Sequence, residues 1–150
     1  MTGLADAFHA LAVTVWAGAL WAIGLLSAPI LFQMIADRTL AGSIAGRLFL
    51  YVALIGIACG LYLLIFRLAR FGTHAVRQGF FWVVVLLLVL TLVGQFGVQP
   101  ILAALKQQAG AQAVMESVLR DRFATWHGIA SVLYVAQCVL ALPLVLLQNR

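Results

Sequence analysis

Charge is what this sequence lacks most. Only 9% of its 150 residues are Asp, Glu, Lys or Arg, whereas hydrophobic residues make up 65%. A water-soluble domain carries about 25% charged residues. The shortage excludes an ordinary soluble domain and predicts an integral membrane protein whose main partner is the lipid bilayer.

The few charges that are present lie between four uncharged runs, at residues 7–36, 48–66, 78–105 and 123–149. A helix needs about 20 apolar residues to cross a ~30 Å hydrocarbon core, and four strands could not close a barrel. The runs therefore predict membrane helices over about 8–35, 41–66, 78–105 and 123–147. Short connections between them favour an all-α, up-down-up-down four-helix bundle, a single transmembrane domain over residues 1–150.

Other absences restrict the chemistry. The uncharged runs hold no buried carboxylate of the kind that proton-coupled transporters use. No zinc-ligand cluster, nucleophile motif or phosphate-binding loop appears, so we do not expect an enzyme. Cys59 and Cys138 have no CxxC spacing and are predicted to act as small apolar residues. The net charge of +5 does not indicate nucleic acid, because the basic residues lie where membrane proteins place them.

We name the side that holds both termini side A and the opposite side side B. The stretch from Arg67 to Arg77 carries three arginines and no acid, which favours a cytoplasmic side A. On side B, residues Ala111, Val114, Met115, Val118 and Leu119 fall on one helical face. This spacing predicts a short amphipathic helix over about 111–120, lying in the interface.

The two halves of the chain resemble each other weakly. Ala28-Pro29-Ile30-Leu31 corresponds to Gln99-Pro100-Ile101-Leu102, which suggests two copies of one helical hairpin in the same orientation. Each proline removes a backbone donor. Both helices are therefore predicted to kink or fray toward side B.

Small residues form a stripe on the second predicted helix. Its members are Gly42, Gly46, Ala53, Gly56 and Gly60. Such stripes let helix backbones approach closely in lipid. This face is expected to meet a neighbouring helix of the bundle or, if it lies outside, a second copy of the chain.

Polar residues gather on facing sides of the third and fourth helices, with one from the first. This polar seam comprises Thr91, Gln95, Gln99, His127, Ser131, Tyr134 and Ser27, and Cys138 shares the same face. The seam predicts either hydrogen bonds between helices, worth about 0.6 kcal/mol each, or a site for a ligand or cofactor.

Two histidines in a four-helix membrane bundle suggest haem b. His127 begins the fourth helix on side B, whereas His9 begins the first on side A. About twenty residues of rise separate them by roughly 30 Å, so they cannot ligate one haem from both faces. Each histidine would bind a separate haem together with another ligand, or neither would bind haem.

The chain resembles the transmembrane protein 205-like family, also called domain of unknown function 4149. The resemblance rests on His9, Trp16-Ala17-Gly18, Ala28-Pro29-Ile30-Leu31-Phe32, Ala41-Gly42, Gly46-Arg47-Leu48-Phe49, Gln99-Pro100 and Arg122-Phe123-Ala124-Thr125-Trp126-His127-Gly128. It implies a bacterial four-helix inner-membrane protein with no settled activity. The layout is also similar to copper-resistance D-type proteins and haem-associated membrane protoporphyrinogen oxidases. These relatives imply haem b or copper at His127 and His9.

Three functional hypotheses follow, in this order. The first is a non-catalytic membrane protein that binds haem b or a metal ion through His127 or His9. The second is a structural or accessory subunit that forms a homo-oligomer or joins a larger membrane complex. The third is a small channel or transporter that uses the polar seam as its path.

Overall fold

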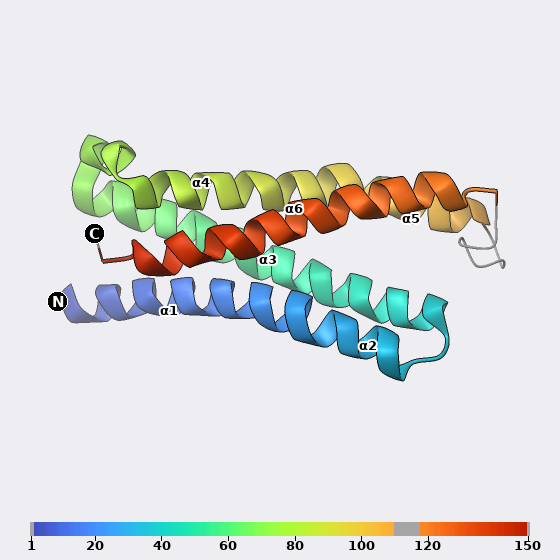
Figure 1. Cartoon of the computed structure of the whole chain (residues 1–150). Coiled ribbons are helices and arrows are strands. Elements are labelled where there is room, and N and C mark those ends of the chain that lie inside the picture. The colour runs from blue at the N-terminus through green and yellow to red at the C-terminus, as the bar shows by residue number, and fades with distance from the viewer. Residues whose placement is uncertain (1, 110–117, 150) are drawn as a thin grey trace.

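The computed structural model describes residues 2–109 and 118–149, and these form four long helical rods (Figure 1). The rods consist of α1 (Thr2–Trp21), η1 (Ala22–Ser27) and α2 (Ala28–Met34); α3 (Arg38–Phe71); α4 (Gly79–Leu92), η3 (Val93–Val98) and α5 (Gln99–Ala109); and α6 (Arg120–Leu146). Each rod is long and apolar enough to cross a membrane. The predicted all-α fold of a multi-pass membrane protein is confirmed.

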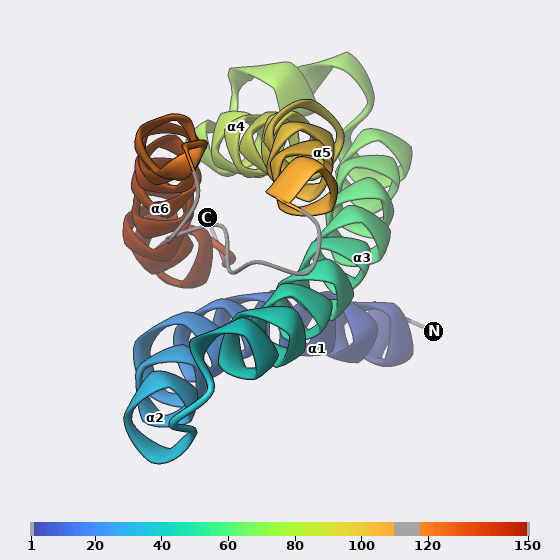
Figure 2. The same ribbon diagram turned by 90° about the vertical axis from the view of Figure 1, so that its right-hand side faces the viewer.

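The rods form a ring in which each has two neighbours. α1 packs against α3 and α6, and α4 packs against the same two helices, as the end-on view shows (Figure 2). Both termini lie at side A (Figure 1). Hydrogen bonds join α1 to α6, because Tyr134 Oη donates to the Leu20 carbonyl at 2.8 Å and Trp21 Nε1 donates to the Cys138 carbonyl at 3.0 Å.

Local chemistry sets the ends of α3. The Asp37 carboxylate accepts hydrogen bonds from the Thr39 and Leu40 amides at 2.8 and 3.1 Å, a typical N-cap. The helix ends at Gly72, whose φ of 55° suits glycine. A short 3-10 helix, η2 (Gly72–Arg77), then leads into α4.

The helices extend beyond the uncharged runs that predicted them. α3 has 34 residues and includes Arg67, which ended the uncharged run 48–66, as well as Arg47, which the predicted helix over 41–66 already contained. A charge ends an apolar run, but a long arginine side chain can remain in a helix when its head group finds partners. The predicted interfacial helix at 111–120 falls mainly on residues 110–117, which lie outside the described residues.

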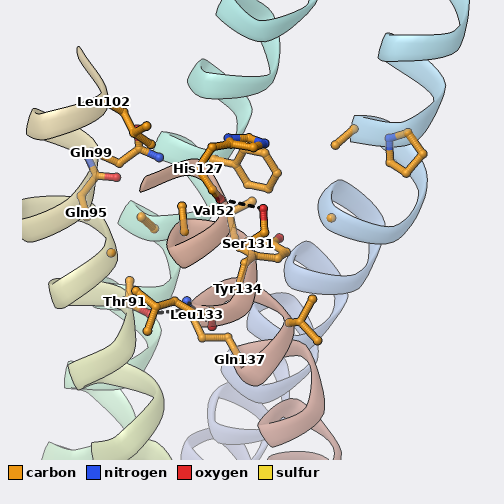
Figure 3. A pocket seen from close by; sticks show the side chains of 18 of the residues that line it. Val52, Thr91, Gln95, Gln99, Leu102, His127, Ser131, Leu133, Tyr134 and Gln137 are labelled. Carbon is orange, nitrogen blue, oxygen red and sulfur yellow. Dashed lines mark hydrogen bonds between the residues drawn. The ribbon is translucent and has the colours of Figure 1, made fainter. Parts of the chain in front are cut away.

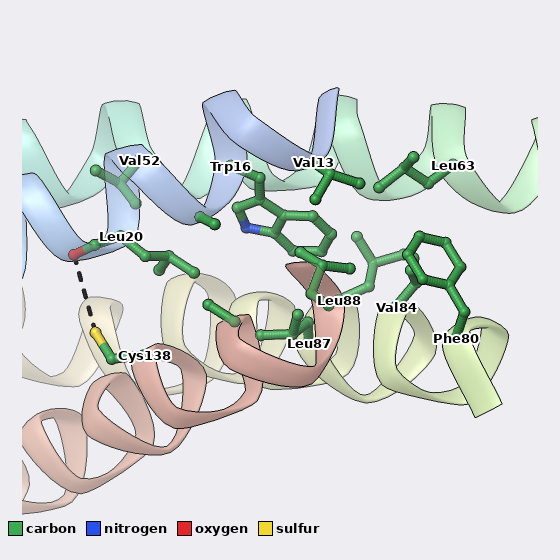
Figure 4. Close-up of a cluster of buried hydrophobic side chains, with 13 residues drawn as sticks. Val13, Trp16, Leu20, Val52, Leu63, Phe80, Val84, Leu87, Leu88 and Cys138 are labelled. Carbon is green, nitrogen blue, oxygen red and sulfur yellow. Dashed lines mark hydrogen bonds between the residues drawn. The ribbon is translucent and has the colours of Figure 1, made fainter. Parts of the chain in front are cut away.

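The side A half of the bundle has a filled apolar core built around Trp16. This indole is 0% exposed and lies among Val13, Leu20, Leu87 and Leu88 (Figure 4). Buried side chains from the other three rods complete the core: Leu63, Phe80, Val84, Ala141 and Leu144.

The small-residue stripe of α3 divides into two parts. A Cβ atom at Gly56 would lie 2.6 Å from Trp16 Nε1, and one at Gly60 would lie 2.7 Å from Leu88 Cδ1. These two glycines therefore let α1 approach α3 inside the bundle. A Cβ at Gly46 would meet nothing within 4 Å, and one at Gly42 would meet only Phe32 at 4.0 Å. The close contact belongs to one chain and does not require a second copy.

Both kinked rods contain a wider π-helical turn directly before the proline. The amide of Ala28 bonds to the Ile23 carbonyl, and that of Gln99 bonds to the Gly94 carbonyl, five residues back in each case. The two turns, 22–27 and 93–98, are offset by 71 residues, as are Pro29 and Pro100. This shared geometry supports the repeat. The helices do not fray, because α2 and α5 continue after each proline.

Candidate functional site

The side B half of the bundle encloses a cavity of about 380 Å³, lined by residues from all four rods. This volume is within the range of pockets that hold small molecules, about 300–1,000 Å³. The two π-helical turns frame the cavity, because Gly24 and Pro29 line it from the first rod and Gly94 and Gln95 from the third. π-helical turns occur frequently at functional sites.

The polar seam lies along one wall of this cavity (Figure 3). Six predicted members line it, together with Gln137: Thr91, Gln95, Gln99, His127, Ser131 and Tyr134. Among the described residues that line the cavity there is no Asp, Glu, Lys or Arg. The wall therefore offers hydroxyl, amide and imidazole groups without a formal charge.

Several of these polar groups are already bonded within the bundle. The Thr91 hydroxyl lies 2.8 Å from both the Leu87 carbonyl and Gln137 Oε1 and donates to one of them. Ser131 Oγ donates to the backbone carbonyl of His127 at 2.9 Å, and does not reach its ring. Tyr134 is held by its bond to Leu20 and contacts the Phe49 ring edge-on at 4.8 Å between centroids.

Three polar side chains at the outer part of the cavity remain available. Within the described part of the chain, no side-chain hydrogen bond involves Gln95, Gln99 or the ring of His127. Gln99 and His127 project toward each other from facing helices (Figure 3). The His127 ring stacks on Phe123, with an interplanar angle of 10°. These three groups can donate to or accept from a bound molecule.

The cavity opens sideways between α2 and α6. Its lining residues Pro29, His127, Ser131 and Val135 are exposed on the surface of the bundle. α2 packs against α3 and diverges from α6, as Figure 1 shows. His127 lies seven residues inside the first residue of α6, roughly 10 Å along the axis. The opening therefore lies on the lateral surface of the bundle, near its side B end.

The opposite wall is apolar. Phe32 of α2 and Phe49 and Val52 of α3 line it beside Ala53, while Leu102 of α5 lies next to Gln99. An apolar wall facing hydrogen-bonding groups is the arrangement that binds an amphiphilic small molecule.

The observed lining differs from the predicted polar seam at two residues. Ser27 does not line the cavity; its hydroxyl donates to the Ala22 carbonyl within the π-helical turn at 3.1 Å. Gln137, which the predicted seam did not include, is buried, and its Oε1 lies 2.8 Å from the Thr91 hydroxyl. The sequence did carry a signal that Gln137 belongs to the seam. It lies three residues after Tyr134, and positions i and i+3 share a helix face.

The two histidines lie at opposite ends of the bundle. His9 is buried between the rings of Phe66 and Phe80, at centroid distances of 4.9 and 5.3 Å, and lies far from the side B cavity. Among residues 2–109 and 118–149, no group of three or more His, Cys, Asp or Glu side chains could hold a metal ion.

A family model described as a domain of unknown function (DUF4149) matches residues 11–111, about two thirds of the chain. The chain belongs to this family. The matched segment contains both π-helical turns, both prolines and the Gly56–Gly60 contact, and it ends before α6. Neither His9 nor His127 lies within it. No curated protein and no solved structure matches the chain.

Proposed function

We propose that this membrane protein binds an uncharged amphiphile, taken from the lipid phase, in the side B cavity. The observation that carries the proposal is the lateral opening onto a wall of free amide and imidazole groups, with no charged side chain among the lining residues that the structure describes. Gln95, Gln99 and His127 would bond a hydroxyl or carbonyl head group. The aromatic and aliphatic wall would hold the apolar tail.

The bottom of the cavity favours binding over conduction. The polar lining ends at Thr91 and Gln137, which bond to each other. Toward side A the bundle is filled by Trp16, Leu20 and Leu87, each no more than 1% exposed. A channel or transporter would need a path through this apolar core, so the arrangement supports a binding pocket closed at its inner end.

Haem b bound through His127 is the second candidate. The observation that favours it is an imidazole without a hydrogen bond on the rim of a cavity, which leaves a nitrogen available to an iron. Within residues 2–109 and 118–149, the cavity wall contributes no second histidine, thiolate or thioether, so only one axial ligand would come from these residues. Copper fits less well, because it prefers several imidazole or sulfur ligands.

The proposed location is the inner membrane of a bacterium, with both termini in the cytoplasm. The four spans support a multi-pass protein. The arginine-rich stretch around η2 supports the orientation, because cytoplasmic loops carry an excess of basic residues. Labelling of single cysteines introduced in η2 from either side of the membrane tests the orientation.

Photolabelling tests the amphiphile proposal. Purified protein in detergent is exposed to a monoacylglycerol that carries a diazirine in its chain, and labelled positions are mapped by mass spectrometry. We expect saturable labelling at Phe32, Phe49 and Val135. Gln99→Leu should weaken binding roughly threefold to tenfold, the cost of one lost hydrogen bond. Gln107→Leu, on the same helix but exposed and outside the cavity, should have no effect.

Uniform labelling of the lipid-facing surface, unchanged in Gln99→Leu, would reject the amphiphile proposal. The haem candidate has its own test, an absorption spectrum of protein purified from cells supplied with haem. A visible band that disappears in His127→Ala would support haem binding. A colourless wild-type protein would reject haem and leave the amphiphile proposal standing.

A further inference from the structure

A second cavity, of about 270 Å³, lies at side A, at the opposite end of the bundle from the proposed amphiphile site. Its lining is polar where the side B cavity is largely apolar. The residues that line it are Asp6, His9, Ala10, Phe66, Arg67, Arg70, Phe71, Gln148 and Asn149. The start of α1, the end of α3 and the chain after α6 therefore meet around it.

His9 is one of the residues that line this cavity, and its imidazole is almost wholly buried. The residue is only 6% exposed and is held between Phe66 and Phe80. Its Nε2 atom is buried and has no hydrogen-bond partner within the described part of the chain. Buried polar atoms nearly always have partners, and leaving one without a partner is costly. A ligand oxygen that reached Nε2 would remove this cost.

Two guanidinium groups face one carboxylate across the same cavity. Arg67 is 3% exposed and is fixed by Gln78 Oε1 at 2.9 Å and by the Gln148 carbonyl at 2.6 Å. It also lies over the Phe80 ring, 4.3 Å from the centroid. Arg70 pairs with Asp6 at 2.9 Å, and both side chains remain 41–50% exposed. The balance of charge among the lining residues favours an anion.

We propose that the side A cavity binds a phosphate-type oxyanion, supplied by the head group of a lipid or by free phosphate. Guanidinium groups present paired N–H donors that match phosphate oxygens, and basic pockets between membrane helices bind anionic head groups. Arg67 and Arg70 supply the positive charge, and His9 Nε2 supplies a neutral donor to a third oxygen. The end of the bundle is the depth at which head groups lie.

Binding of two probes tests this proposal on the intact chain in detergent. Phosphatidylglycerol binding is measured by native mass spectrometry, and inorganic phosphate binding by isothermal titration. Arg70→Gln should weaken binding of the true ligand about tenfold, the loss of a charge-assisted hydrogen bond. Arg77→Gln removes the same charge from the same end, but that exposed residue does not line the cavity. It should change binding less than twofold.

Asp6→Asn should change the affinity for the anion in the opposite direction. Removing the carboxylate releases Arg70 and raises the net charge of the cavity, so binding should become tighter. A variant that merely damaged the fold could not produce this increase. His9→Phe supplies a further check, because an apolar ring fits between Phe66 and Phe80. It should weaken binding and leave the melting temperature of the unliganded protein unchanged or higher.

The two probes separate the sources of the anion. If phosphatidylglycerol binds saturably and its affinity changes across the variants as predicted, the ligand is a lipid head group. If inorganic phosphate shows this pattern instead, the ligand is a free anion. The proposal is overturned if neither probe binds saturably, or if Arg70→Gln and Arg77→Gln have equal effects. None of these results depends on the side B cavity.

Discussion

The side A half of this bundle has a filled apolar core beneath the cavity at its end, whereas the side B half is hollow between the rods, although the same four rods build both. In the filled half, two glycines of α3 accept the Trp16 indole, so α1 and α3 lie close together. In the hollow half, each kinked rod passes through a π-helical turn and a proline. The difference teaches that, in a chain of such uniform hydrophobicity, local backbone geometry decides where a cavity forms.

The polar residues follow the same division. The side B groups line an uncharged cavity that opens on the lateral surface of the bundle, while the side A groups include two arginines and an aspartate at the end of the bundle. The two ends therefore suit different ligands. Each of the following experiments changes one half and measures whether the contrast between the halves persists.

The largest effect is expected from Gly56→Leu in the filled half. A Cβ atom there already lies 2.6 Å from Trp16 Nε1, so a leucine must separate α1 from α3. Overpacking of this kind costs about 3 kcal/mol. Thermal unfolding in detergent should show a clear loss of stability.

Gly46→Leu is the matched control on the same helix, because a Cβ atom at position 46 would meet nothing within 4 Å. It should leave the melting curve nearly unchanged. If the two variants melt at the same temperature, then Gly56 does not make the close contact, and the account of the filled half is wrong.

A smaller effect is expected from Thr91→Val at the boundary between the halves. The change removes the hydroxyl that lies 2.8 Å from Gln137 Oε1 and leaves a buried amide without this partner. The free energy of unfolding should fall by about 1–3 kcal/mol. The double variant Thr91→Val/Gln137→Leu should recover most of that loss, because neither partner is then left unsatisfied. Additive losses in the double variant would contradict the direct pairing.

The sequence predicted much of the architecture, because each span is an uncharged run and each connection holds charges. It did not predict that Arg67 would be buried at the end of α3, since the partners of its guanidinium come from Gln78 and from the far end of α6. The glycine stripe indicated a close contact. It could not name Trp16 as the partner, because that pairing depends on how α1 and α3 are aligned.

The candidate site was also predictable only in part. Helical spacing placed Gln95, Gln99 and His127 in the polar seam, and all three line the cavity. The cavity itself could not be predicted, because it depends on the two π-helical turns and on the divergence of α2 from α6. Each proline indicated a kink, but nothing in the sequence indicated the widened turn before it.

The smallest effect on stability is expected from Ala130→Leu, which adds bulk to the hollow half. Ala130 lines the side B cavity from α6, so a leucine there can extend into open volume and does not displace a neighbouring helix. The free energy of unfolding should change by less than about 1 kcal/mol, because filling a cavity with apolar groups offsets the strain of a larger side chain. Photolabelling by the diazirine monoacylglycerol should nevertheless fall sharply, since the added isobutyl group occupies the space proposed for the tail.

The contrast with Gly56→Leu separates stability from binding, because two additions of bulk then have opposite consequences. One destabilises the bundle, and the other removes ligand and leaves the bundle stable. Full labelling in a stable Ala130→Leu protein would show that the amphiphile binds elsewhere. A large loss of stability would instead show that α6 is as tightly packed near side B as α3 is near side A.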